Sequence, residues 1–267
     1  MTHDGRTVEA LVAAALRGEL ESSEAWEAVD ALHRRGGEAV FLAASALLRS
    51  PRPKERVRGA DILAQLTQPS DVRPRCVERM LPMLQEEADA QVLQALVLGL
   101  GHLRDERVPR AIAPLRDHPS AKVRGAVLLA LLKAPESEPP SLLLSFVGDA
   151  DEGVRGLAMV HLRGLPDEAD APELREVLLR RLDDASPTIR AEAVLVLARR
   201  KDARVLEPLR KALRRSRVRL EFIDAAGALG DASLLPLLRA LGGAGRDDDV
   251  PFTRTLAQAL AALERVA

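Results

Sequence analysis

The chain of 267 residues carries a formal net charge of −1 and is 47% hydrophobic, yet aromatic residues make up 2% and tyrosine is absent. A near-neutral balance excludes a protein whose whole surface attracts nucleic acid or membrane. A core of Ala, Leu and Val also argues against a β-sandwich or barrel, which uses β-branched and aromatic residues.

The first elements expected along the chain are amphipathic helices. Residues 6–17 place Val8, Leu11 and Leu16 on one face, and residues 22–34 and 37–49 follow as a helical hairpin. The first 18 residues contain neither a signal peptide nor a transmembrane span, which predicts a cytoplasmic protein without membrane contact. The lone cysteine, Cys76, lies in an apolar helical segment and is expected to be a small buried hydrophobic residue.

From residue 57 onward, a Val-Arg phrase followed by an Ala/Leu-rich run returns along the chain. Successive copies begin 35, 31, 31, 35 and 29 residues apart, which fits two helices and two turns per unit. The copies are Val57-Arg58, the degenerate Val92-Leu93, Val123-Arg124, Val154-Arg155, Ile189-Arg190 and Val218-Arg219.

Each unit is predicted to consist of a first helix, a short turn and a second helix. A cap such as Pro119-Ser120 or Ser186-Pro187 begins the first helix, because a side-chain oxygen can accept a backbone N–H there. An aspartate stands in the turn, as at Asp105, Asp202 and Asp231. We therefore expect one repeat domain over residues 1–267, with a cap helix in 1–21, repeats in 22–249 and a closing helix in 250–267.

The segments VRGLAMVHLRGL and IRAEAVLVLARRKDARVLEPLRKAL resemble HEAT repeats, and most of all the bacterial subgroup first described in phycobilisome lyases. The resemblance covers residues 22–266. It implies an all-α, right-handed α-solenoid of about six hairpins with terminal capping helices. It also implies that first helices lie on the convex side, while second helices line a concave groove that binds a protein or, in some members, a nucleic acid.

The arginines of the Val-Arg phrase are expected to be structural. Each lies one turn into a helix, and acidic residues such as Asp149, Asp151, Asp183 and Asp184 precede the first helices of neighbouring units. Stacking then predicts hydrogen-bonded ion pairs between repeats, made by Arg58, Arg124, Arg155, Arg190 and Arg219.

A basic stretch at residues 199–219 predicts a contact for an acidic protein surface. It contains ten Lys or Arg against two acids, a local charge of +8, and the alternative is a solvated helix face balanced elsewhere. The second-helix stripe of Val205, Leu209 and Leu213 turns the neighbouring cations outward. The position eight residues after the turn aspartate recurs at Arg79, Arg210 and Arg239. The predicted partner-binding residues are Arg79, Arg110, Arg175, Arg180, Arg210, Lys211, Arg214 and Arg239.

Catalytic patterns are missing from the sequence. The five histidines are scattered and none belongs to a His-Glu pair, which is unlike the iron-binding HEAT-like hydroxylases. No phosphate loop, zinc spacing or Gly-x-Ser-x-Gly is present. Asp247, Asp248 and Asp249 are expected to cap the last helix rather than bind a metal ion. We therefore expect no enzyme activity, cofactor, metal or small-molecule substrate.

These patterns favour a non-enzymatic scaffold or adaptor that binds a protein through its concave second-helix face. The alternative is a nucleic-acid-binding protein, similar to HEAT-like DNA glycosylases, that uses the Arg-rich C-terminal repeats. Few aromatics are available to stack on bases, since Trp26 lies near acidic residues and Phe222 on a predicted core face. A third hypothesis, a bilin lyase or chaperone, rests on the subgroup's name alone.

Overall fold

In the computed structural model, the described residues are 5–69, 71–134, 139–166, 170–242 and 250–265, and all regular elements within them are helical. The predicted all-α repeat fold is confirmed. Contacts divide the chain into two compact units, Met1–Ser137 and Glu138–Ala267. A single continuous repeat domain stays a prediction.

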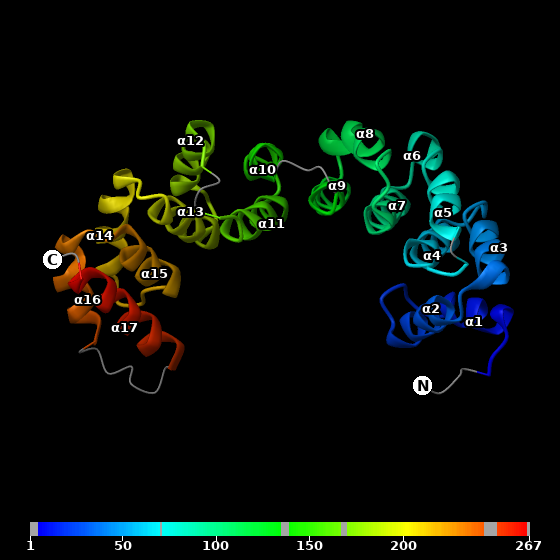
Figure 1. The fold of residues 1–267 in the computed structure, drawn as a ribbon, viewed down its shortest axis with the longest axis horizontal. Coiled ribbons are helices and arrows are strands. Elements are labelled where there is room, and N and C mark those ends of the chain that lie inside the picture. Colours follow the sequence, from blue (N-terminus) through cyan, green and yellow to red (C-terminus); the bar gives the residue numbers. More distant parts are fainter. Residues whose placement is uncertain (1–4, 70, 135–138, 167–169, 243–249, 266–267) are drawn as a thin grey trace. The chain divides into compact units, whose positions relative to one another are not determined.

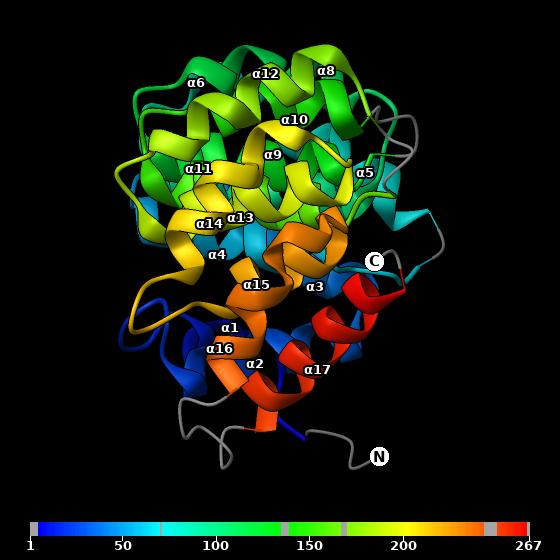
Figure 2. The same ribbon diagram turned by 90° about the vertical axis from the view of Figure 1, so that its left-hand side faces the viewer.

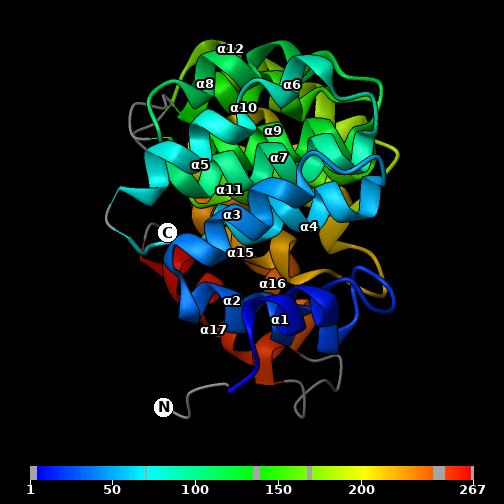
Figure 3. The same ribbon diagram turned by 90° about the vertical axis from the view of Figure 1, so that its right-hand side faces the viewer.

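Unit 1 begins with the expected helix and hairpin, followed by paired helices (Figures 1 and 3). The bounds match the sequence periodicity to within a few residues. Its elements are α1 (Val8–Ala15), α2 (Ser23–Arg35), α3 (Gly37–Leu47), α4 (Pro53–Ala64), α5 (Val72–Met80), α6 (Met83–Glu86), α7 (Ala90–Leu103), α8 (Val108–Ile112), the 3-10 helix η1 (Ala113–Asp117) and α9 (Ala121–Leu132).

Unit 2 repeats the same alternation of helices and ends on the expected last helix (Figure 2). The buried face of that helix packs on α15 and α16. Its role as a cap stays a prediction. The elements are α10 (Pro139–Val147), α11 (Glu152–Arg163), α12 (Pro172–Arg180), η2 (Arg181–Asp183), α13 (Pro187–Arg199), η3 (Ala203–Val205), α14 (Leu206–Leu213), α15 (Leu220–Leu229), η4 (Ala232–Leu234), α16 (Leu235–Gly242) and α17 (Val250–Glu264).

The turn aspartates lie where the sequence predicted them, and the structure adds a capping role. Asp105, Asp202 and Asp231 each accept the backbone N–H of the residue two positions later, at 3.0, 3.1 and 2.9 Å. This satisfies a free donor at the start of the second helix. The expected caps at Ser120 and Ser186 are wrong in detail, because neither serine side chain accepts a capping hydrogen bond.

The first helices pack directly on one another within each unit: α4, α7 and α9 in unit 1, and α11, α13, α15 and α17 in unit 2. Small residues allow this approach. A Cβ on Gly101 of α7 would lie 2.7 Å from the Cα atom of Ala130 in α9, and one on Gly227 of α15 would lie 2.9 Å from that of Ala259 in α17.

This close packing sets the bend of each unit taken by itself. Figure 1 shows the first helices on the inner side of the bend, with α3, α5 and α8, or α10, α12, α14 and α16, on the outer side. The close approaches at Gly101 and Gly227 are both between first helices, so they shorten the inner side. The expectation that second helices line a concave groove is therefore wrong within each unit.

The interior is built mainly from Leu, Val and Ala, as the composition predicted. Cys76 is fully buried in α5, and burial raises the pKa of its thiol to about 11. The prediction that it serves as a small hydrophobic residue is confirmed. None of the helices in the described ranges is long and apolar enough to cross a lipid bilayer.

Candidate functional site

Arginines at the fourth residue of a first helix make a common set of contacts. In Arg124, Arg155 and Arg190, the Nη1 group donates to the carbonyl oxygens of the residues six and five positions earlier. Arg56 likewise donates from Nη1 to the carbonyl oxygen of Ser50 at 3.0 Å. These four side chains, called the junction arginines below, hold the loop that joins one hairpin to the next.

Two junction arginines also pair with a carboxylate of the following repeat. Arg56 donates from Nε and Nη2 to Glu87 at 2.7 and 2.9 Å, and Arg155 donates to Asp184 at 2.9 and 3.0 Å. The carboxylate side chains are only 6% and 2% exposed. Both contacts are bidentate, which is the strong geometry for an arginine and a carboxylate.

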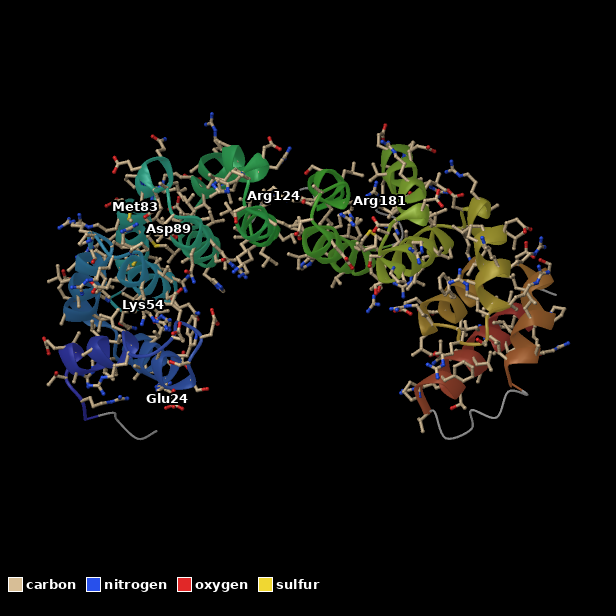
Figure 4. The ribbon with its side chains drawn as sticks, turned by 180° about the vertical axis from the view of Figure 1, so that it is seen from behind. Glu24, Lys54, Met83, Asp89, Arg124 and Arg181 are labelled. Carbon is tan, nitrogen blue, oxygen red and sulfur yellow. The ribbon has the colours of Figure 1, made fainter. Side chains whose placement is uncertain are left out.

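Asp184 is held by several donors besides Arg155. The backbone N–H of Ser186 donates to it at 3.0 Å, and Arg181, labelled in Figure 4, lies 3.3 Å away. Burial alone would raise the pKa of this carboxyl, but these hydrogen bonds and charges outweigh burial and lower it. Asp184 therefore remains a carboxylate that ties α11 to the start of α13.

Arg58 does not take part in this pattern, although it carries the Val-Arg phrase. Its side chain is fully buried and donates to the carbonyl oxygens of Ala15 and Leu20, so it fastens the α1–α2 connection to α4. Nη1 donates to Asp61 at 3.0 Å. Burial raises the pKa of Asp61 to about 6, although Arg58 opposes the rise.

Arg219 also stands outside the junction set. It is the N-cap residue of α15 and pairs with Glu221 at 3.0 Å, two residues along the chain. The Val-Arg phrase missed Arg56 because α4 begins at Pro53, so that Arg56, and not Arg58, is the fourth residue of the helix. A proline three residues before an arginine marks both Arg56 and Arg190, and that signal identifies the junction position.

Part of the basic stretch belongs to a network of carboxylates that also includes Arg175 of α12. Arg175 of α12 binds Asp170, lies 3.4 Å from Asp202, and donates to the carbonyl oxygen of Arg200 at 2.9 Å. Arg204 pairs with both Asp202 and Glu176, each at 2.7 Å. This network connects α12 to the turn before α14. It therefore cancels part of the local charge of +8.

The other predicted partner-binding residues fall into two groups. Arg210 donates to Glu207 and to Ser233 Oγ, Arg239 pairs with Glu264 at 2.9 Å, and Arg180 donates to a backbone carbonyl. By contrast, four side chains are exposed and make no ion pair with any residue that the structure describes: Arg79 and Arg110 in unit 1, and Lys211 and Arg214 in unit 2.

Of the two unpaired cations of unit 2, Lys211 borders a cleft of about 540 Å³ between α13, α14 and α15. Arg190 and Lys211 line it together with Arg215, which follows α14. Phe222 was expected on the core face, but it is half-buried and lines this cleft. The remaining lining residues are Leu182, Asp183, Val194, Glu207, Pro208 and Ala212.

A corresponding cleft of about 470 Å³ in unit 1 is lined by three arginines, including Arg49, and three glutamates. It contains Arg56 and Arg79 together with Glu78, Glu86 and Glu87, and it includes Met83, which Figure 4 labels. The cations here face carboxylates of the same cleft. The unit 2 cleft therefore has the stronger positive character.

The histidines serve structural contacts where the structure describes them in detail. His33 Nε2 lies 3.1 Å from the carbonyl oxygens of Asp61 and Ile62, and His102 Nε2 lies 3.1 Å from Lys133 Nζ. In the described ranges no group of three His, Cys, Asp or Glu is placed to hold a metal ion. The acidic residues 247–249 lie outside those ranges.

Comparison with known families identifies the repeats. Residues 175–261, which include α13, α14, α15 and most of α17, match a family model described as HEAT repeats. HEAT repeats are therefore shown for residues 175–261. The prediction drawn from the Val-Arg phrase is confirmed.

Known proteins share this HEAT-repeat fold over different lengths. YibA of Escherichia coli strain K12 is 33% identical over 119 residues, a match that spans 45% of this chain and 42% of YibA. The X-ray structure of YibA superposes with a TM-score of 0.80 at 21% identity and covers 99% of both chains. The condensin Cnd3–Cnd2 subcomplex of S. pombe gives a TM-score of 0.57 at 14% identity, covering 97% of this chain and 43% of that chain.

The narrower resemblance to the phycobilisome-lyase subgroup stays a prediction. The CpcE–CpcF complex of the phycocyanin lyase from Nostoc covers 98% of this chain, but at 18% identity and a TM-score of 0.46. A likeness at this level carries no argument about the function of these HEAT repeats.

Proposed function

We propose that this chain is a non-enzymatic scaffold or adaptor that binds an acidic surface of a partner protein through α14 and the loop after it. The observation that carries the proposal is the division of the basic stretch. Within it, Arg204 and Arg210 pair with carboxylates, as Arg175 of α12 also does. Lys211 and the arginines from Arg214 to Arg217 are exposed and make no ion pair with any described residue.

The proposed face lies on a second helix, at the outer side of the bend of unit 2. Exposed cations there keep their hydration until a partner arrives, and opposite charge on the partner speeds association and selects the correct orientation. The HEAT-repeat fold supports this use, because one structural neighbour, Cnd3–Cnd2, is a subcomplex of two proteins. The proposed binding surface is therefore on the outer side of the bend, and not in a concave groove as the sequence predicted.

Two observations support a protein partner over a nucleic acid. The chain as a whole is near neutral, whereas nucleic-acid binding draws its affinity mainly from cations that neutralise phosphates. Aromatic rings are also poorly placed to stack on bases. Trp26 lies in unit 1 with the buried Arg58 guanidinium 5.0 Å from its ring centre, and Phe222 is half-buried.

The proposal is tested by a pull-down from a nuclease-treated native lysate, with bound proteins identified by mass spectrometry. The test variant combines Lys211→Glu, Arg214→Glu and Arg217→Glu. We expect a protein retained by the wild type to be lost from this variant, because the charge of its binding face is reversed.

The matched control combines Arg73→Glu, Arg116→Glu and Lys122→Glu in unit 1, which are also exposed and unpaired among the described residues. It changes the net charge by the same amount and should retain the partner. Equal retention by the test variant contradicts the proposal. Co-purification of nucleic acid alone, before nuclease treatment, favours the nucleic-acid alternative.

A further inference from the structure

Arg190 is prepared for a carboxylate in the same way as Arg155, but it has none within the described part of the chain. Its Nη1 group donates to the carbonyl oxygens of Asp184 and Ala185, as Nη1 of Arg155 does to its own loop. In Arg56 and Arg155, the Nε and Nη2 groups bind a carboxylate of the next repeat. In Arg190 this edge has no partner among the described residues, and Arg190 is one of the residues that line the unit 2 cleft.

The sequence of the next connection explains the difference. The carboxylates that close the other junctions, Glu87 and Asp184, each stand in the connection before the following first helix. The connection from α14 to α15, residues 214–219, contains no carboxylate. Its charged residues are Arg214, Arg215, Arg217 and Arg219.

One of these arginines, Arg215, lies near Arg190, since both residues line the same cleft. Two cations beside one cleft repel one another unless an anion lies between them. Three cations, Arg190, Lys211 and Arg215, line the cleft against two carboxylates, Asp183 and Glu207, and Glu207 also pairs with Arg210, so the lining keeps a surplus of positive charge. The cleft therefore favours an anion supplied from outside the chain.

The apolar lining determines which anion fits. Leu182, Val194 and Phe222 give the cleft an apolar wall, which gains from covering an aliphatic side chain and gains little from a sugar-phosphate backbone. The guanidinium edge matches a planar carboxylate bidentately, as the two closed junctions show. A glutamate or aspartate next to an apolar residue meets both requirements.

We propose that the Nε–Nη2 edge of Arg190 binds a side-chain carboxylate from an acidic, partly apolar segment of a partner protein, with Lys211 and Arg215 as flanking cations. The partner's carboxylate takes the role that Asp184 has for Arg155. The contacts from Nη1 to the loop hold the guanidinium in place beforehand, which reduces the entropy lost on binding. This inference rests on the proposed scaffold function and assigns its recognition chemistry.

The experiment measures peptide binding by isothermal titration calorimetry with the full-length protein. The probe is a peptide of alternating glutamate and leucine, acetylated and amidated so that side-chain carboxylates are its only acids. We expect saturable binding to the wild type and none of the corresponding glutamine–leucine peptide.

Two variants assign that binding to Arg190. Arg190→Lys keeps the positive charge but loses the bidentate edge, and should weaken binding about tenfold. Arg215→Glu leaves Arg190 and its loop contacts intact but introduces a carboxylate from the chain itself, and should weaken binding by about the same factor. Arg116→Glu in unit 1 makes the same charge change as Arg215→Glu and should leave the affinity unchanged.

Three results overturn the inference: no binding of the glutamate peptide, unchanged affinity in Arg190→Lys, or tighter binding of a single-stranded oligonucleotide at the same cleft. Failure here is distinguishable from failure of the scaffold proposal. If Arg190→Lys has no effect but the triple Glu variant loses the protein in the pull-down, the scaffold stands and the Arg190 site falls. If the peptide binds through Arg190 and no protein is retained in the pull-down, the Arg190 site stands and the scaffold proposal falls.

Discussion

Two junctions of unit 2 use the same arginine in opposite ways. Arg155 and Arg190 each occupy the fourth residue of a first helix and donate to the loop before it. Arg155 then meets Asp184, which is 2% exposed, whereas the connection that follows α14 offers Arg190 only arginines. The role of a repeat arginine is therefore decided about thirty residues downstream, by the partner that the next repeat brings.

The largest expected effect on stability is at the junction where Asp184 pairs with Arg155, called the closed junction below. Asp184→Ala removes the acceptor of Arg155 and leaves a nearly buried guanidinium without its carboxylate, which should lower the free energy of unfolding by about 3 kcal/mol. Urea titration followed by circular dichroism measures this loss. Glu264→Ala, which removes an exposed pair with Arg239, is the control and should cost at most about 1 kcal/mol. Similar losses in both variants would contradict the comparison.

The closed junction should also make stability depend on acid. Because the pKa of Asp184 is lower in the folded protein than in the unfolded chain, the unfolded chain takes up this proton first as the pH falls. The stabilisation that Asp184 provides is thus complete above about pH 5 and is lost as the pH falls through the lowered folded pKa. Urea titrations between neutral and acid pH should show a steeper loss in the wild type than in Asp184→Asn. Identical slopes would show that Asp184 is not held as a carboxylate.

Alanine at Arg190 should cost less than alanine at Arg155. Arg190→Ala removes hydrogen bonds to two loop carbonyls, which amounts to about 1 kcal/mol. Arg155→Ala removes similar bonds and also leaves Asp184 buried without its main partner, so about 3 kcal/mol is expected. The same urea titrations measure both variants. Equal losses would mean that the Arg190 guanidinium already has a carboxylate partner inside the folded chain.

The smallest expected effect is a gain in stability. Arg215→Glu relieves the repulsion between two cations of the cleft and provides Arg190 with a carboxylate, which should raise the free energy of unfolding by about 0.5 kcal/mol. Differential scanning calorimetry should show a slightly higher Tm than in Arg116→Glu, the charge-matched control. A clear decrease in Tm would show that Arg215 already has a stabilising role.

Much of the fold could be predicted because its signals are local. The apolar spacing identified the hairpins and the last helix, and aspartates stand at the turns as expected. The junction arginines were only partly identified, since the Val-Arg phrase does not start at the same helical position in every copy. Arg58 is six residues into α4, whereas Arg219 precedes the first residue of α15.

The partner-binding residues were harder to predict because neutralising groups come from distant positions. Arg175 meets Asp202 and Arg239 meets Glu264, 27 and 25 residues away. No local pattern reports such pairs. The free cations at Lys211 and Arg214 were identified, but Arg215, Arg217 and the exposed edge of Arg190 were not.

The sequence by itself determined that this protein is a chain of helical hairpins with an Ala/Leu/Val interior, because helical periodicity and turn capping depend on neighbouring residues. Only the tertiary structure decided which helices lie on the inner side of each unit and which cations remain available. The first depends on how closely helices approach at contacts such as Gly101 with Ala130. The second depends on whether the next repeat brings a carboxylate or an arginine to the junction.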